Sequence, residues 1–210
     1  LAGAAFAVAL GSVKAAACQT VVGRHVMQKN GFDRERFVED CAAAGRESDG
    51  QAAVREVLVR AVADSGAVRS VMGEPLRAGM DVLHRSATLT IFAAKWTPQM
   101  HLLAHDHRMW AIIGIYAGRE DNILWRRTRD GIEAYGARVL FAGDVAVLPS
   151  GAIHSVTNPL QRFTGGIHIY GGDFFDTARS QWNAETLKEE RSDGDTIRAM
   201  FERENERIRR

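Results

Sequence analysis

Cysteine is scarce in this chain, since its 210 residues include only Cys18 and Cys41. Two cysteines cannot form the disulfide framework of a small secreted domain. Neither has a second cysteine at the spacing of a metal site, which argues against thiolate metal ligands. The reducing cytoplasm is therefore the expected location.

An excess of charge of either sign is also lacking. Lys and Arg total 27 against 26 for Asp and Glu, which gives a net charge of +1. A protein that binds nucleic acid or an anionic membrane surface needs a basic excess to neutralise phosphates. We therefore expect no nucleic acid and no membrane among the partners, and a small molecule as the substrate.

A long apolar run is missing as well. Residues 1–26 are rich in Ala, Val and Gly, but their apolar run is too short to span a bilayer. The first cation, Lys14, follows this run, whereas a secretory signal carries its basic region ahead of it. We interpret residues 1–26 as an N-terminal extension outside the fold, with an export signal as the alternative. The sequence leaves open whether the mature protein retains them.

The composition that remains is that of a globular protein. The apolar fraction is 46% and the charged fraction 25%, and the length suits one domain with a well-buried core. Within residues 27–79 the apolar side chains recur at helical spacing, which predicts a helical N-terminal segment of three helices. Residues 176–210 predict a C-terminal helical segment whose helix packs on the outside of the core.

Capping residues predict where the first two helices begin and end. Asp33 is the expected N-cap of the first helix, and Gly45 its end. Ser48 and Gln51 are spaced as a capping box for the second helix. Gly66 is the expected end of that helix.

Between residues 80 and 175 the pattern changes to short β-branched and aromatic runs separated by Gly, Asn, Asp and Pro. Such runs predict antiparallel strands, and eight of them without intervening helices favour an all-β core, either a barrel or a jelly roll. Arg119–Asn122 and Asp130–Gly131 are expected hairpin turns. The predicted strands cover residues 81–85, 88–96, 105–117, 122–129, 137–141, 145–148, 153–157 and 163–170.

Histidines gather in this β region, where five of the seven in the chain lie between His101 and His168. Residues i and i+2 of a strand share a face, so His105 and His107 are expected to project together. His154 follows a turn at Pro149–Gly151 and is expected on a neighbouring strand, where it can supply a third imidazole to a metal. The alternative is an exposed pair that satisfies local hydrogen bonds. His101 matches no motif and is expected in a surface turn.

Two segments resemble the cupin motifs. The first motif is matched by His105 and His107, although its usual glutamate position falls at Ala111 or Ile112, neither of which can bind a metal. The second motif is matched at each of its fixed positions, which are Gly143, Pro149, Gly151, His154 and Asn158. The resemblance implies a cupin double-stranded β-helix, or jelly-roll barrel, with His105, His107 and His154 as metal ligands.

A cupin site with three histidines and no glutamate is similar to that of the thiol dioxygenases, the group of cysteine dioxygenase and 3-mercaptopropionate dioxygenase. The segment 105–114 resembles their metal-binding strand. The segment 167–173 resembles the one that supplies a histidine and a tyrosine beside the metal, and the matching residues are His168 and Tyr170. The resemblance implies that Tyr170 donates a hydrogen bond to oxygen or to the substrate and that His168 holds its hydroxyl.

Three positions depart from that group. Ala111 stands where the animal enzymes carry a cysteine that cross-links to the tyrosine, and Gly166 stands where the group has a serine. The arginine that holds the substrate carboxylate has no clear match. Arg85 is the candidate, because it ends the predicted strand ahead of the barrel.

The resemblance therefore implies a mononuclear non-heme Fe(II) dioxygenase, with one iron per chain, that oxidises a small thiol to a sulfinate with O2. Imidazole ligands also suit Zn(II) and Ni(II), so the metal is not fixed by its ligands. One alternative is a three-histidine cupin that cleaves a carbon-carbon bond, or acts as an isomerase or hydrolase. Another is a cupin that only binds a small molecule. The identity of the thiol and the oligomeric state stay open.

Overall fold

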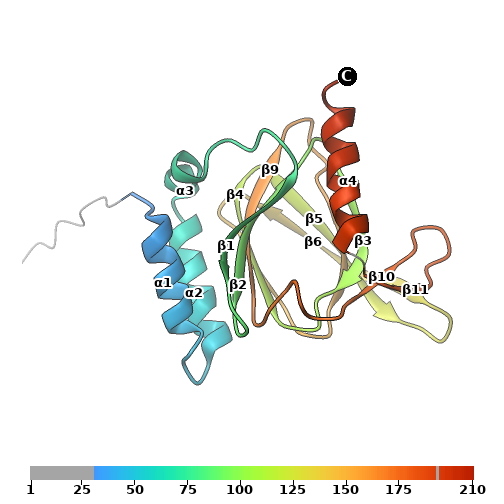
Figure 1. Ribbon diagram of the computed structural model, residues 1–210, viewed down its shortest axis with the longest axis horizontal. Helices are drawn as coiled ribbons and strands as arrows, with labels where there is room; N and C mark the ends of the chain where they lie inside the picture. The colour runs from blue at the N-terminus through green and yellow to red at the C-terminus, as the bar shows by residue number, and fades with distance from the viewer. Residues whose placement is uncertain (1–30, 193) are drawn as a thin grey trace, which may run out of the picture.

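The computed structural model describes residues 31–192 and 194–210 (Figure 1). The predicted extension over residues 1–26 lies outside the described residues. No helix within the described ranges is both long enough and apolar enough to cross a membrane.

Three helices precede the strands, namely α1 (Arg34–Ala44), α2 (Gly50–Val62) and α3 (Ser65–Met72). The prediction for α1 is confirmed, because the Asp33 carboxylate accepts a hydrogen bond from the Arg36 backbone N–H at 3.0 Å and Gly45 follows the last turn.

The predicted ends of the second helix were wrong. Ser48 lies outside α2, which has Asp49 at its N-cap position, so no capping box with Gln51 forms. Gly66 lies inside α3, because the Asp64 side chain accepts a hydrogen bond from the Ala67 N–H at 2.9 Å and starts a new helix there.

The strands form two antiparallel sheets. The first sheet has the order β1 (Gly79–Arg85), β2 (Thr90–Trp96), β9 (Thr164–Tyr170), β4 (Ala111–Ala117) and β7 (Val145–Leu148). The second has the order β11 (Glu189–Arg191), β10 (Ser180–Trp182), β3 (His101–Asp106), β8 (Ile153–Thr157), β5 (Arg119–Arg127) and β6 (Ile132–Phe141).

The chain alternates between these sheets. β2, β4, β7 and β9 belong to the first sheet, whereas β3, β5, β6 and β8 belong to the second. Two facing antiparallel sheets wound in this way form a jelly-roll barrel, the double-stranded β-helix. The predicted fold class is confirmed.

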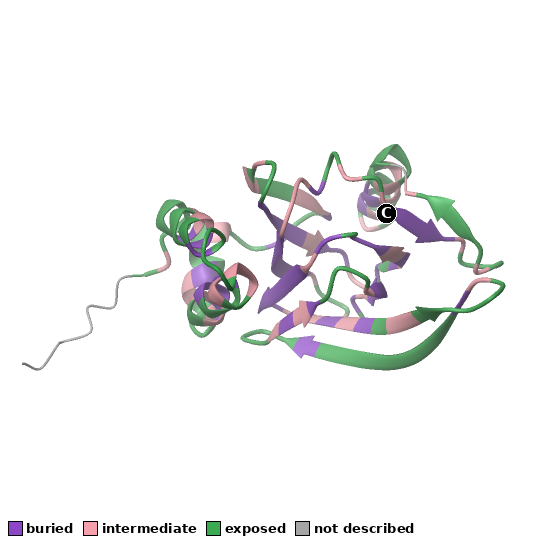
Figure 2. Ribbon diagram, turned by 90° about the horizontal axis from the view of Figure 1, so that it is seen from below, coloured by how far each residue is buried: buried purple, intermediate pink, exposed green. Residues whose placement is uncertain are grey.

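Burial on both faces explains the apolar texture of the first sheet. Ile113 and Ile115 of β4 point into the barrel core, while Ile112 packs under the helices against residues such as Leu58 of α2. Figure 1 places α1 and α2 on one side of the barrel, and in Figure 2 the buried residues concentrate on the strands and on the helix sides that face them. The same alternation in β9 directs His168 and Tyr170 into the barrel.

Two local predictions in the β region were wrong. The strand predicted over 105–117 is broken after Asp106, because Arg108 adopts a φ of 58° and the chain turns there from one sheet to the other. The turn predicted at Arg119–Asn122 lies inside β5, and the chain bends instead at Gly118. The predicted turn at Asp130–Gly131 is confirmed, since the Thr128 N–H donates to the Gly131 carbonyl.

The C-terminal segment begins with the short hairpin β10–β11, which the helical prediction for residues 176–210 did not include. The predicted helix follows as α4 (Gly194–Arg207). Its Phe201 ring stacks on Trp96 at 5.7 Å and belongs to the core inside the barrel. Asn205 both accepts from the Ala78 N–H and donates to the Ala78 carbonyl. The helix therefore closes one opening of the barrel, on the side away from α1–α3 (Figure 1).

Candidate metal centre

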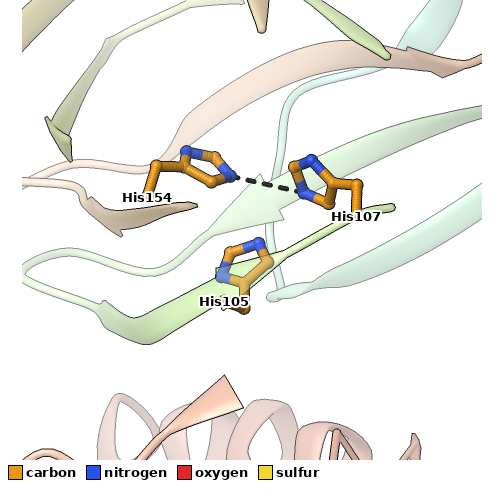
Figure 3. A group of neighbouring side chains, drawn as sticks. All are labelled: His105, His107 and His154. Carbon is orange, nitrogen blue, oxygen red and sulfur yellow. Dashed lines mark hydrogen bonds between the residues drawn. The ribbon is translucent and has the colours of Figure 1, made fainter. Parts of the chain in front are cut away.

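Three histidines converge inside the barrel (Figure 3). β3 and β8 pair so that His105 lies directly opposite His154, and His107 is the first residue beyond β3. One ring nitrogen of each side chain can point to a common centre, and these three atoms lie within 4.8 Å of one another. The strand pairing thus brings together the three residues that the sequence singled out.

Hydrogen bonds orient two of these rings. His105 Nδ1 lies 2.9 Å from the Leu103 carbonyl oxygen, and His154 Nδ1 lies 2.6 Å from Asn122 Oδ1. Because both oxygens accept, each Nδ1 carries the hydrogen, and each Nε2 keeps its lone pair. The Nε2 atoms of His107 and His154 face each other at 3.3 Å (Figure 3).

The three imidazoles favour the neutral form. Burial lowers the pKa of His105 to about 4, and burial together with the neighbouring imidazoles holds the pKa of His107 and His154 well below the usual value. A metal needs its imidazole ligands deprotonated, so these side chains are ready to bind without first losing a proton. The cluster fits a divalent metal, and its residues could hold one without a carboxylate ligand.

His168 and Tyr170 lie beside this cluster on β9. His168 Nδ1 is 3.2 Å from the Tyr170 hydroxyl, and the Tyr170 ring packs edge-on against His107 with centroids 4.9 Å apart. Burial raises the pKa of Tyr170 above its usual range, so the phenol keeps its proton. Phe92 and Phe174 pack against the Tyr170 ring and hold it in place.

A buried carboxylate that the sequence analysis missed stands behind His168. Glu120 Oε2 lies 3.4 Å from His168 Nε2, and the Glu120 side chain is fully buried. Gly166, at the expected serine position, leaves room for this approach, since a Cβ there would lie 3.3 Å from His168 Nε2. The sequence feature that could have identified Glu120 is the pattern Glu120-x-Asn122, because residues i and i+2 of a strand point to the same face.

A cavity of about 470 Å³ opens onto the histidines. Its lining includes His105, His154, His168 and Tyr170, and the other walls are mainly apolar, with Ile197 and Phe201 of α4 among them. Water reaching the histidines through this cavity therefore passes apolar side chains. The site is suited to a small organic molecule with a polar end at the histidines.

The sequence analysis also missed Arg179, which lines the same cavity. Its guanidinium lies over the Phe174 ring at 3.7 Å, and its Nε is buried without a hydrogen-bond partner among the described residues. Burial lowers the pKa of Arg179, but the group stays charged, because a guanidinium does not lose its proton in proteins. A half-buried guanidinium whose Nε is buried and unused is suited to an anionic group of a ligand.

Arg85, the sequence-based candidate for that role, is not brought to the histidines. Its Nε donates to the Asp173 carboxylate at 2.9 Å, and it lines a separate hollow with Arg108 and Asp173. Arg108 does not line the cavity at the histidines either, and it pairs with Asp106 at 2.7 Å. His101 is exposed as predicted, but it is the first residue of β3 and not part of a turn.

No protein-family model matches the sequence, and no curated protein matches it. The solved structures that are similar to part of this chain include three bacterial and archaeal proteins. A conserved protein with a double-stranded β-helix domain from Klebsiella pneumoniae is 17% identical over 48% of this chain and 79% of that one, with a TM-score of 0.37. A Bacillus halodurans protein is 18% identical over 46% and 71%, with a TM-score of 0.41. An RmlC-like cupin family protein from Methanocaldococcus jannaschii is 10% identical over 46% and 82%, with a TM-score of 0.39.

Proposed function

We propose that the protein is a mononuclear non-heme Fe(II) dioxygenase that oxidises a small thiol to a sulfinate with O2. The observation that carries the proposal is a cluster of three neutral imidazoles, with no carboxylate among them, at the end of a cavity that also contains Tyr170 and Arg179. His105, His107 and His154 would hold the iron, which supplies the redox chemistry with O2.

The reaction balances without a further reductant. The thiol loses its S–H proton, two S–O bonds form, and the O–O bond breaks, so that sulfur loses four electrons and O2 gains four. The protein's part is to bind and orient the thiol, to exclude water and to direct polar groups at the sulfur end.

Arg179 indicates which thiols the protein would prefer as substrates. The Arg179 Nε is buried without a hydrogen-bond partner among the described residues, so a ligand that brings an acceptor would use it, and a carboxylate matches a guanidinium best. The preferred thiols therefore carry a carboxylate at the end remote from sulfur.

The test is O2 consumption by Fe(II)-loaded protein with cysteine, 3-mercaptopropionate, cysteamine, larger thiols and a non-thiol diketone. We expect one O2 consumed per sulfinate formed, with a thiol carboxylate preferred over cysteamine. Absence of uptake with every thiol, from protein that holds one iron per chain, would overturn the proposal.

Two arginine variants test the anchor. We expect Arg179→Met to raise KM for thiol carboxylates by about tenfold to a hundredfold, the loss of one charge-assisted hydrogen bond, and to change KM for cysteamine little. Arg85→Met is the comparison, because its guanidinium is held by Asp173 away from the cavity. A larger KM effect from Arg85→Met than from Arg179→Met would contradict the choice of Arg179.

The cavity favours one alternative. Its lining includes the histidines and also Ile197 and Phe201 of α4, and its volume of about 470 Å³ leaves room for a molecule larger than the smallest thiols. A three-histidine cupin metalloenzyme that acts on a larger carbon substrate would use that space. Uptake of O2 with the diketone and with no thiol would favour this function.

A further inference from the structure

Glu120 is a carboxylate enclosed by hydrogen-bond donors in the middle of the barrel. Its side chain has 0% exposure. Trp96 Nε1 donates to Oε2 at 2.9 Å, and Asn122 Nδ2 donates to Oε1 at 3.0 Å. His168 Nε2 approaches Oε2 at 3.4 Å. An ionised carboxylate can only accept hydrogen bonds, so Trp96 and Asn122 each direct an N–H at it. The His168 contact lies outside hydrogen-bond geometry, but the negative charge favours the ring hydrogen on the nitrogen that faces it.

Through Asn122, the Glu120 carboxylate also affects the proposed metal ligand His154. With its Nδ2 directed at Glu120, the Asn122 amide must present Oδ1 to His154, whose Nδ1 lies 2.6 Å away. His154 Nδ1 therefore carries the hydrogen, and Nε2 keeps the lone pair that a metal needs. The carboxylate thus determines the tautomer of a ligand that it does not touch.

The same carboxylate acts on Tyr170 through His168. With its hydrogen on Nε2, on the side of the Glu120 carboxylate, the His168 ring offers Nδ1 as an acceptor. Nδ1 is 3.2 Å from the Tyr170 hydroxyl, so the phenol donates its hydrogen bond to His168, and not to oxygen or the substrate as the resemblance implied. The Tyr170 oxygen then presents its lone pairs to the cavity.

We infer that Glu120 is a positioning residue that fixes the proton positions on both sides of the site, at His154 through Asn122 and at Tyr170 through His168. The inference rests on the metal site of the proposed function. The carboxylate also stands beside His168 Nε2, close to the position where Gly166 replaces the serine that the resemblance implies.

The ionisation of Glu120 is consistent with this role. Burial alone would raise its pKa, but His168 and the hydrogen bonds from Asn122 and Trp96 outweigh burial and lower the pKa below its usual value. The carboxylate is therefore charged near neutral pH, where it accepts from Trp96 and Asn122.

The Glu120→Gln variant puts a donor where only acceptors fit. Trp96 is a donor only, so the oxygen of the new side-chain amide faces Trp96 and its NH2 group faces Asn122. The Asn122 amide must then turn over and present its NH2 to His154. This moves the His154 hydrogen to Nε2, where it blocks the metal.

The measurement is the Kd for Co(II), in the absence of thiol and O2. We expect Glu120→Gln to raise this Kd by about tenfold to a hundredfold, the usual effect of losing a group that orients a ligand. The matched control is Glu133→Gln, whose carboxylate pairs with Arg126 on the surface and whose Kd should equal that of the parent.

A second variant tests the direction of the hydrogen bonds. In Glu120→Gln/Asn122→Asp, the amide NH2 introduced at position 120 donates to the carboxylate introduced at position 122. That carboxylate accepts from His154 Nδ1, as Asn122 does in the parent. We expect Kd to return close to the parental value. A purely structural role for the Glu120 charge predicts no such recovery.

The inference is overturned if Glu120→Gln binds Co(II) as tightly as the parent, or if the double variant binds no better than the single one. Should the single variant not fold, the double variant decides alone: parental affinity supports the inference, and failure to fold or bind overturns it. Failure of the parent to bind Co(II) would instead count against the metal site.

Direct evidence comes from the metal-free parent. Long-range ¹H–¹⁵N correlation spectra report which ring nitrogen of a histidine carries hydrogen. We expect Nδ1–H at His154 and Nε2–H at His168, and the reverse tautomer at either residue contradicts the inference. Neither this measurement nor the affinity depends on thiol oxidation, so both remain informative if the protein proves inactive toward thiols.

Discussion

The two arginines considered as ligand anchors differ in what surrounds each guanidinium. Arg85 lies at the surface against Asp173, where its charge is already paired. Arg179 lies over the Phe174 ring with an unused donor in the cavity. A donor buried away from water without a partner costs free energy, and an anionic ligand that accepts from it would recover that cost.

Cys41 is a second titratable residue whose burial changes its ionisation. Its thiol lies in the core between the helices and the first sheet, and burial raises its pKa to about 12 from the usual 9.0. The neutral thiol is therefore favoured by folding. Cys41 should not compete with thiol substrates or react with reagents in the folded protein.

Burial of the Cys41 thiol makes the free energy of unfolding depend on pH in the alkaline range. Folding raises the Cys41 pKa, so its contribution to stability is complete below about pH 9 and is lost as pH rises toward 12. The loss approaches about 1.4 kcal/mol per pH unit in that window. Urea unfolding at about pH 8 and about pH 10.5, on either side of the unfolded-state pKa, should show a smaller pH-dependent loss for Cys41→Ala than for the parent. Equal losses in both proteins would contradict the burial of this thiol.

At the scale of elements, the bend between β4 and β5 positions the site. Gly118 has a φ of 79°, and a Cβ there would lie 2.4 Å from Thr164 Oγ1. That hydroxyl accepts from the Arg119 N–H at 3.0 Å and donates to the Arg119 carbonyl at 2.8 Å. The bend thus ties the start of β5, which carries Glu120 and Asn122, to β9, which carries His168 and Tyr170.

We expect Gly118→Ala to lower the free energy of unfolding by about 2–4 kcal/mol, because it combines a left-handed backbone with a steric clash. Urea denaturation measures this change. The control is Gly151→Ala, since a Cβ at Gly151 meets nothing within 4 Å and its φ is not positive. Comparable stability of the two variants would show that the bend tolerates a side chain.

For the whole molecule, the metal site joins strands that are distant in the sequence. His105 and His107 come from the end of β3, and His154 comes from β8, which follows β5, β6 and β7. A metal bound by all three cross-links the second sheet in the folded state only. Binding should therefore stabilise the fold by mass action.

We expect Co(II) or Fe(II) at about a hundred times its Kd to add about 2.7 kcal/mol of stability. For a domain of this size that corresponds to a rise in Tm of about 5–11 °C. His154→Ala should remain folded but lose stoichiometric metal and the Tm shift, whereas His101→Ala, at an exposed position, should retain both. A parental Tm shift in His154→Ala would exclude His154 as a ligand.

The sequence by itself determined the features that depend on local periodicity. Alternation along a strand placed His105 with His107 and His168 with Tyr170, and turn residues marked most of the strands. These features need only neighbours in the chain, because the backbone geometry of a strand fixes which side chains share a face.

The tertiary structure alone decided which distant groups meet. The facing of the two sheets sets Glu120 against His168, and the loop over residues 171–179 carries Arg179 to the cavity without any periodic pattern. The break after Asp106 and the choice of Arg179 over Arg85 depend on the same long-range packing. Periodicity specifies a face of an element, whereas contact across the barrel depends on how all the elements close together.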